Sequence, residues 1–133
     1  MDDQDKFDFW LDTAQYDIST AISMFNTGRW VYVAFMCQQA IEKLIKGLYI
    51  LYIDDNVPRI HNICILLDKF IDKLPVAVDQ TLYKFFETLS VFYINTRYTS
   101  YKQKIQSIVN KQEAESILSK TKEVFAWLLT LKP

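Results

Sequence analysis

Apolar residues recur every three or four positions along most of this chain, the spacing that places them on one face of an α-helix. In the first segment the steps between successive apolar positions are 4, 3, 4, 3 and 4 residues. These positions are Phe7, Leu11, Ala14, Ile18, Ala21 and Phe25. Thr27-Gly28 follows, and because glycine readily adopts the left-handed conformation that ends helices, we expect the first helix to stop there.

The second predicted helix, from about Arg29 to Tyr52, has a wider apolar surface than the first. Its central stripe consists of Val33, Cys37, Ala40, Ile41, Leu44 and Leu48. Further apolar and aromatic residues widen it, namely Tyr32, Phe35, Met36, Ile45 and Tyr49. We therefore expect this helix to contact neighbours on more than one side and to lie at the centre of the fold.

Three further helical segments follow the loop IDDNVPR, in which Pro58 interrupts the helical pattern. The spacing predicts a short helix over His61–Lys73, a helix over about Val76–Asn95 and a last helix over about Lys111–Leu131. Four long helices and one short helix favour an all-α fold, an antiparallel up-and-down four-helix bundle with an additional short helix. We expect residues 1–133 to form a single helical domain.

Composition narrows the class of protein. Of the 133 residues 50% are hydrophobic, and 2 glycines and 3 prolines are too few for a loop-rich β-sandwich or a disordered chain. A net charge of −1 excludes a strongly basic surface for duplex DNA. The acidic N-terminus lacks the apolar core of a secretory signal, and no apolar run is long enough to span a bilayer. Because Cys37 and Cys64 suit buried, reduced thiols, we expect a cytoplasmic protein.

Residues that usually carry catalysis are few. His61 is the one histidine of the chain, which excludes a multi-histidine metal site, and the two cysteines form no CxxC pair. Two isolated glycines cannot build a phosphate-binding loop. We therefore predict no catalytic residue, no metal and no cofactor. His61 itself fits a capped or partly buried structural residue, with a role in a site as the alternative.

The segment CQQAIEKLIKGLYI places polar residues in the middle of the predicted central helix. Helical spacing indicates one face with Gln38, Glu42 and Ile45, and another with Gln39, Lys43 and Lys46. Polar groups in such a helix need partners or water. Two interpretations stay open: the glutamines and the glutamate hydrogen-bond across helices or a dimer seam while the lysines are solvated, or these residues line a ligand groove.

A second polar and aromatic cluster follows the fourth predicted helix. It consists of Asn95, Arg97, Tyr98, Tyr101, Lys102 and Lys104. A guanidinium fork matches phosphate oxygens and a tyrosine ring stacks on bases, so one interpretation is a phosphate or base site. The other is an arginine paired with an acidic neighbour beside tyrosines that cover the edge of the core. Residues 97–133 carry seven bases and three acids, enough for one phosphate group but not for a duplex.

These features together resemble the HEPN domain, over residues 5–131. The resemblance rests on Trp10, Ala14, Asp17 and Ala21, on Gly28 with the aromatic residue after it, on FMCQQAIEKLIKGLYI, on His61 with Leu66-Leu67, and on YINTRY. It implies an antiparallel helical bundle, commonly homodimeric, in a prokaryotic cytoplasm. It also implies a minimal nucleotidyltransferase as partner in a toxin–antitoxin-like system. Many HEPN proteins are metal-independent ribonucleases with an R-x(4–6)-H motif completed across the dimer, and others bind nucleotides or act as scaffolds.

This sequence departs from the ribonuclease motif. Arg97 matches the arginine of the motif by location, but Lys102, Gln103 and Lys104 occupy the positions where the histidine would stand. Cleavage of RNA through its 2′-hydroxyl needs a group that exchanges a proton near neutral pH, which histidine does well. We therefore expect a non-catalytic HEPN-like module that homodimerises and binds a nucleotide or a partner minimal nucleotidyltransferase.

The same hypothesis predicts four ligand contacts. Lys43 and Arg97 would bind phosphate, Tyr98 would stack on a base, and Gln39 would read polar edges. This requires the bundle to bring Gln39 and Lys43 close to Arg97. Two alternatives remain: a metal-independent ribonuclease toxin whose general base is His61 or a water, and an interaction protein that uses surface aromatics. Those aromatics are Trp30, Tyr32, Tyr93 and Tyr101.

Overall fold

The computed structural model describes the backbone of residues 1–97 and 108–133, and within these ranges every regular element is a helix. The side chains described are those of residues 1–93 and 108–133. The elements are α1 (Asp3–Asn26), α2 (Trp30–Tyr52), α3 (Ile63–Asp68), the 3₁₀ turn η1 (Ile71–Lys73), α4 (Gln80–Arg97) and α5 (Lys111–Leu129). The predicted all-α fold, a helical bundle with an additional short helix, is confirmed.

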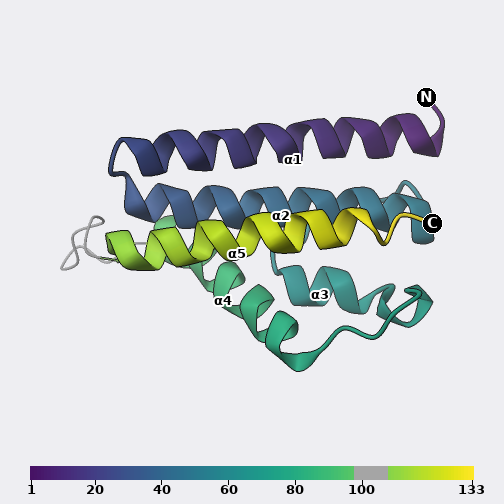
Figure 1. The fold of residues 1–133 in the computed structure, drawn as a ribbon. Coiled ribbons are helices and arrows are strands. Elements are labelled where there is room, and N and C mark those ends of the chain that lie inside the picture. Colours follow the sequence, from purple (N-terminus) through teal and green to yellow (C-terminus); the bar gives the residue numbers. More distant parts are fainter. Residues whose placement is uncertain (98–107) are drawn as a thin grey trace.

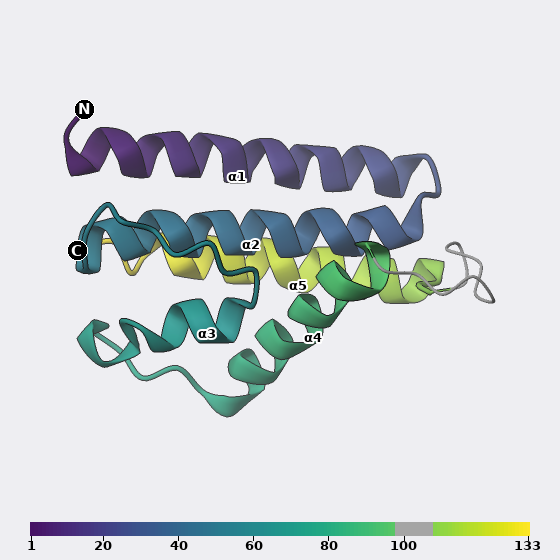
Figure 2. The ribbon, with the colours of Figure 1, turned by 180° about the vertical axis from the view of Figure 1, so that it is seen from behind.

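The four long helices alternate in direction, and α2 lies at their centre (Figures 1 and 2). α1, α2 and α5 run side by side along most of their length. In contrast, α4 crosses the bundle at an angle, and the C-terminal end of α4 is the part that approaches α2. The predicted central position of the second helix is confirmed by the complete burial of its stripe. The fully buried residues include Cys37, Ala40, Ile41, Leu44 and Leu48.

A glycine brings α1 and α2 together. A Cβ atom at Gly47 would lie 3.1 Å from Phe7 Cδ2 and 3.1 Å from Trp10 Cβ. These separations are shorter than ordinary van der Waals contact. The missing side chain therefore lets α1 approach α2 closely at this level.

Capping residues explain where several helices begin and end. Asp2 caps α1 by accepting a hydrogen bond from the Asp5 backbone N–H, and Asn110 forms a capping box with Glu113 at the start of α5. Gly28 follows α1 with φ +75°, the left-handed conformation expected for it.

Two predicted elements have different boundaries in the structure. The third predicted helix is broken, because α3 spans only Ile63–Asp68 and η1 follows as a separate turn. The fourth begins at Gln80 rather than near Val76, because Asp79 Oδ1 accepts a hydrogen bond from the Leu82 N–H at 2.8 Å. An aspartate in this position satisfies one free N–H at the start of a helix, which fixes the start there.

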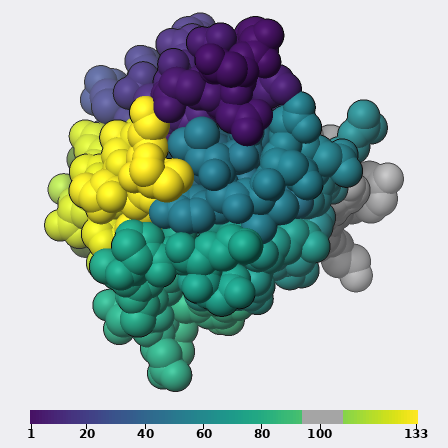
Figure 3. Space-filling view, turned by 90° about the vertical axis from the view of Figure 1, so that its right-hand side faces the viewer, coloured from purple at the N-terminus to yellow at the C-terminus, as the bar shows by residue number. Residues whose placement is uncertain are grey.

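The two ends of the chain meet at one end of the bundle (Figure 3). Tyr52 Oη at the end of α2 donates a hydrogen bond to the Leu131 carbonyl, and Lys6 pairs with Asp55 in the loop after α2. These contacts attach the C-terminal segment and the start of α1 to the end of the central helix. Among the helices described, none combines the length and apolarity needed to cross a bilayer.

Candidate functional site

A row of polar residues is buried along α2. Gln38, Glu42 and Lys46 follow one another at four-residue steps and are 0%, 3% and 6% exposed. Gln38 Nε2 donates to Glu42 Oε1 at 2.9 Å, and Lys46 Nζ donates to Glu42 Oε2 at 3.0 Å. Each oxygen of the Glu42 carboxylate thus receives a proton donor, which offsets the cost of burying its charge.

The lysines of α2 correct one expectation from the sequence. Lys46 belongs to the row with Glu42, not to a face with Gln39 and Lys43, and it is buried rather than solvated. Its ammonium lies 5.9 Å from the centre of the Trp10 ring of α1, a cation–π geometry. The carboxylate and the aromatic ring together make burial of this ammonium tolerable.

His61 lies in the segment just before α3 and contacts this row of polar residues. Its Nδ1 lies 3.3 Å from both carboxylate oxygens of Glu42, and its carbonyl accepts a hydrogen bond from Gln38 Nε2 at 3.0 Å. Its ring stacks on Tyr93 of α4, with centroids 4.3 Å apart and planes 17° apart. The side chain is nevertheless 47% exposed. His61 is therefore fixed on one edge and one face while part of its ring stays open to solvent.

Tyr93 joins α4 to the same site. Its ring also stacks on Phe35 of α2, with centroids 5.9 Å apart. Arg97 follows Tyr93 by four residues on α4, which is about one helical turn, or roughly 6 Å along the axis. We call the group formed by Gln38, Gln39, Glu42, Lys46, His61 and Tyr93 the α2–α4 cluster.

The four predicted ligand contacts have different places in the structure. Gln39 belongs to the α2–α4 cluster, because its Nε2 donates to Gln38 Oε1 at 2.7 Å. Lys43 pairs with Asp17 of α1, with Nζ 2.7 Å from Oδ2. Arg97 is the last residue of α4 and its side chain lies outside the described part of the chain, as does the whole of Tyr98. The ligand roles of all four stay predictions.

Sequence reasoning missed the contact between Glu42 and His61. The two residues are 19 positions apart and meet only because the chain reverses after α2. The prediction from sequence places Gln38 and Glu42 on one face but Lys46 on another, and no local pattern joins these residues to His61 or to Tyr93. The one signal in the sequence that points to this contact is that His61 is the only histidine of the chain.

The cysteines offer no reactive thiolate. Cys37 and Cys64 are both free and buried. Burial raises the pKa of each thiol to about 11. Since the thiolate is the nucleophile and the metal ligand, neither cysteine is poised for chemistry near neutral pH. Among the residues that the structure describes, no group of three or more His, Cys, Asp or Glu side chains could hold a metal ion.

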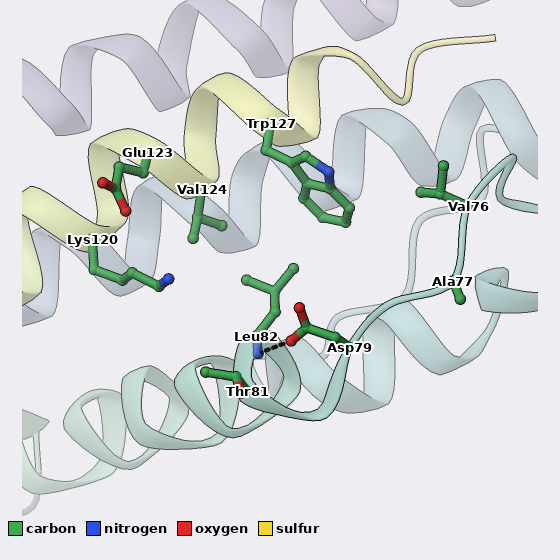
Figure 4. Close-up of a pocket in the computed structure, with 9 residues that line it drawn as sticks. All are labelled: Val76, Ala77, Asp79, Thr81, Leu82, Lys120, Glu123, Val124 and Trp127. Atoms are coloured by element: carbon green, nitrogen blue, oxygen red, sulfur yellow. Dashed lines mark hydrogen bonds between the residues drawn. The ribbon is translucent and has the colours of Figure 1, made fainter.

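A hollow of about 310 Å³ lies away from the α2–α4 cluster, between α5 and the start of α4 (Figure 4). Its lining includes the apolar side chains of Leu82, Val124 and Trp127, with Lys120 and Glu123 on the α5 side. The inclination of α4 opens this space. Asp79 also lines the hollow, but its Oδ1 already accepts the hydrogen bond from the Leu82 N–H that caps α4, so this oxygen is occupied.

Comparisons with known proteins agree with the fold. The model of the HEPN domain family matches residues 7–131. The crystal structure of TT1696 from Thermus thermophilus superposes with a TM-score of 0.80 at 23% identity, covering 94% of this chain and 97% of that one. The crystal structure of ST0689, described as an archaeal HEPN homologue, gives a TM-score of 0.75 at 19% identity, covering 96% and 98%.

No curated protein matches the sequence significantly. At identities of 23% and 19%, the two solved structures establish a shared fold and nothing finer. The family match covers nearly the whole chain and includes both α2 and His61. This chain therefore belongs to the HEPN domain family.

Proposed function

We propose that this HEPN domain, formed by residues 1–133, homodimerises and binds a nucleotide at the α2–α4 cluster without cleaving it. The observation that carries the proposal is the position of His61, which is half exposed while Glu42 holds one ring edge and Tyr93 covers one ring face. A polar ring fixed in this way at a surface is a preorganised ligand contact.

The phosphate of the nucleotide is assigned to Arg97. This residue lies about one turn beyond Tyr93 on α4, and a guanidinium is suited to bidentate recognition of phosphate oxygens. Lys43 is the weaker candidate, because Asp17 at 2.7 Å already neutralises much of its charge. In this proposal Tyr98 stacks on the base and Gln39 contacts a polar edge of the ligand.

Isothermal titration calorimetry with adenosine monophosphate tests the proposal. We expect the wild-type protein to bind and Arg97→Ala to lose affinity by about tenfold or more, since charged hydrogen bonds contribute roughly 1.5–3 kcal/mol. Arg29→Ala is the matched control, because Arg29 is an exposed arginine before α2. Equal binding by wild type and Arg97→Ala would remove Arg97 from the site.

A second candidate function is a metal-independent ribonuclease. The specific observation in its favour is the His61–Glu42 contact, because a carboxylate that orients an imidazole is a common arrangement for general acid–base catalysis. Incubation of total RNA with the protein in EDTA separates the two functions. The leading proposal predicts intact RNA. Cleavage that is lost in both Arg97→Ala and His61→Ala would establish the ribonuclease instead.

A partner protein is the other ligand compatible with the proposal. The resemblance to HEPN proteins implies a minimal nucleotidyltransferase as that partner, in a toxin–antitoxin-like system. Co-expression of this chain with a nucleotidyltransferase encoded beside its gene, followed by size-exclusion chromatography, tests the pairing. Co-elution is the expected result, and separate elution would leave the nucleotide as the ligand.

A further inference from the structure

The surroundings of Glu42 determine which nitrogen of His61 carries a proton. Glu42 accepts hydrogen bonds from the Gln38 amide and from the Lys46 ammonium. These donors stabilise an ionised carboxylate, which can only accept hydrogen bonds. The favourable contact between Glu42 and His61 Nδ1 at 3.3 Å therefore requires a proton on Nδ1. In the neutral ring, Nε2 is then left with a free electron pair.

The Nε2 edge of the ring is the one available to a ligand. Among the described residues, none forms a hydrogen bond with Nε2, whereas Nδ1 faces Glu42 and one ring face lies on Tyr93. The side chain keeps 47% of its surface exposed. A ligand that approaches the α2–α4 cluster would therefore meet a hydrogen-bond acceptor at this edge.

We propose that Glu42 is a positioning residue that makes His61 Nε2 the acceptor for a ribose 2′-hydroxyl, so that the site prefers ribonucleotides to deoxyribonucleotides. This inference rests on the proposed nucleotide binding. A phosphate oxygen only accepts hydrogen bonds and cannot pair with an unprotonated nitrogen, whereas a ribose hydroxyl donates one. The 2′-hydroxyl is also the group by which proteins distinguish RNA from DNA at a given position.

Nitrogen NMR reads the protonation of His61 directly, because the chain has one histidine and its signals need no assignment. In the wild-type protein at pH 8 we expect the neutral ring to carry its proton on Nδ1. Glu42→Gln should shift the population toward Nε2–H, since the glutamine amide can donate to Nδ1. Glu115→Gln, an exposed glutamate on α5, is the matched control and should leave the signals unchanged. A wild-type ring protonated on Nε2, or on both nitrogens, would overturn the inference.

Calorimetry tests the consequence for ligand choice. We expect adenosine monophosphate to bind the wild-type protein about 3- to 10-fold more tightly than 2′-deoxyadenosine monophosphate, the range that one hydrogen bond contributes. His61→Ala should abolish this preference and Glu42→Gln should reduce it, with circular dichroism confirming that both variants are folded.

The two proposals fail in different ways. Equal affinity of the wild-type protein for both nucleotides would overturn the preference for ribose while leaving the nucleotide site intact. Binding of neither nucleotide would overturn the proposed function and the preference together. A preference that persists in folded His61→Ala would assign recognition of the 2′-hydroxyl to another residue.

Discussion

Lys43 and Lys46 are separated by less than one turn of α2, yet their partners differ. Lys43 pairs with Asp17 of α1, and Lys46 pairs with Glu42 on its own helix. Both ion pairs have a largely buried carboxylate. Removing the lysine from such a pair should lower the stability of the fold, because the carboxylate then keeps a buried charge with no opposite charge beside it.

Lys43→Met should therefore destabilise the protein by about 2 kcal/mol, which is below the usual cost of breaking a buried pair because Lys43 is partly exposed. Urea denaturation measures the free energy of unfolding. The double variant Asp17→Leu with Lys43→Met is the control and should be more stable than Lys43→Met alone, since it no longer buries an unpaired charge. A single variant as stable as wild type would show that the Asp17 pair does not stabilise the fold.

Ionisation of the Cys37 thiol should make the free energy of unfolding depend on pH. Burial raises its pKa to about 11 from the ordinary value of 9.0. The folded protein thus prefers the neutral thiol, and this contribution is complete below pH 9 and lost as the pH rises from 9 toward 11.

Between pH 8 and pH 10 the wild-type protein should lose about 1 kcal/mol more stability than Cys37→Ala, which has no thiol to ionise. Urea denaturation of both proteins under reducing conditions at the two pH values measures this difference. The difference between the two slopes isolates the thiol from the tyrosines and lysines that also titrate in this range. Identical slopes would contradict the assignment.

At the scale of single elements, the close approach of α1 and α2 depends on Gly47. Alanine is usually about 1 kcal/mol better than glycine inside a helix. Here its methyl group would lie 3.1 Å from Trp10 Cβ, which is attached to the backbone of α1, and from the buried ring of Phe7. Neither group can move aside without shifting α1.

Gly47→Ala should lower the free energy of unfolding by about 1 kcal/mol, because overpacking outweighs the gain in helix propensity. Thermal and urea denaturation give the change. Ser119→Ala on the exposed side of α5 adds helix propensity without a new contact and should be neutral or slightly stabilising. A rise in stability of Gly47→Ala would mean that α1 adapts freely.

The elements differ in how well their sequences predict them. α1, α2 and α5 follow their apolar spacing to within a few residues, because each packs a continuous stripe against the core. The predicted start of α4 near Val76 is wrong, because Val78 continues the apolar spacing although Asp79 is the cap and the helix begins at Gln80. Asp79 is the first residue after Pro75 of a type that caps helices, so this boundary could be recognised from the sequence by its cap rather than by apolar spacing.

At the scale of the whole molecule, the α2–α4 cluster joins three segments that are distant in sequence. Glu42 lies on the central helix, His61 precedes α3, and Tyr93 lies near the end of α4. Periodicity predicts that these helices pack together, but it does not predict which turns of them face each other. The sequence therefore indicated Gln39 and Arg97 as candidates, while the contact of Glu42 with His61 appeared only once the fold was assembled.

Light scattering coupled to size-exclusion chromatography tests the proposed homodimer. We expect a mass of about 31 kDa, twice the 15.7 kDa of one chain. Tyr32 is one of the surface aromatics that the sequence indicates for an interface, and it lies exposed at the start of α2. Tyr32→Glu should lower the dimer fraction, and Tyr16→Glu on the exposed side of α1 is its control. A mass of one chain for the wild-type protein at micromolar concentration would contradict the dimer.

The central claim is that a nucleotide binds at the α2–α4 cluster, and titration of isotopically labelled wild-type protein with adenosine monophosphate tests it most directly. The imidazole signals of His61 report on the cluster without ambiguity, because no other histidine is present. We expect saturable shifts of these signals together with those of the backbone amides of α2 from Gln38 to Lys46. Imidazole signals that stay unchanged at saturating nucleotide, or shifts confined to the hollow between α4 and α5, would contradict it.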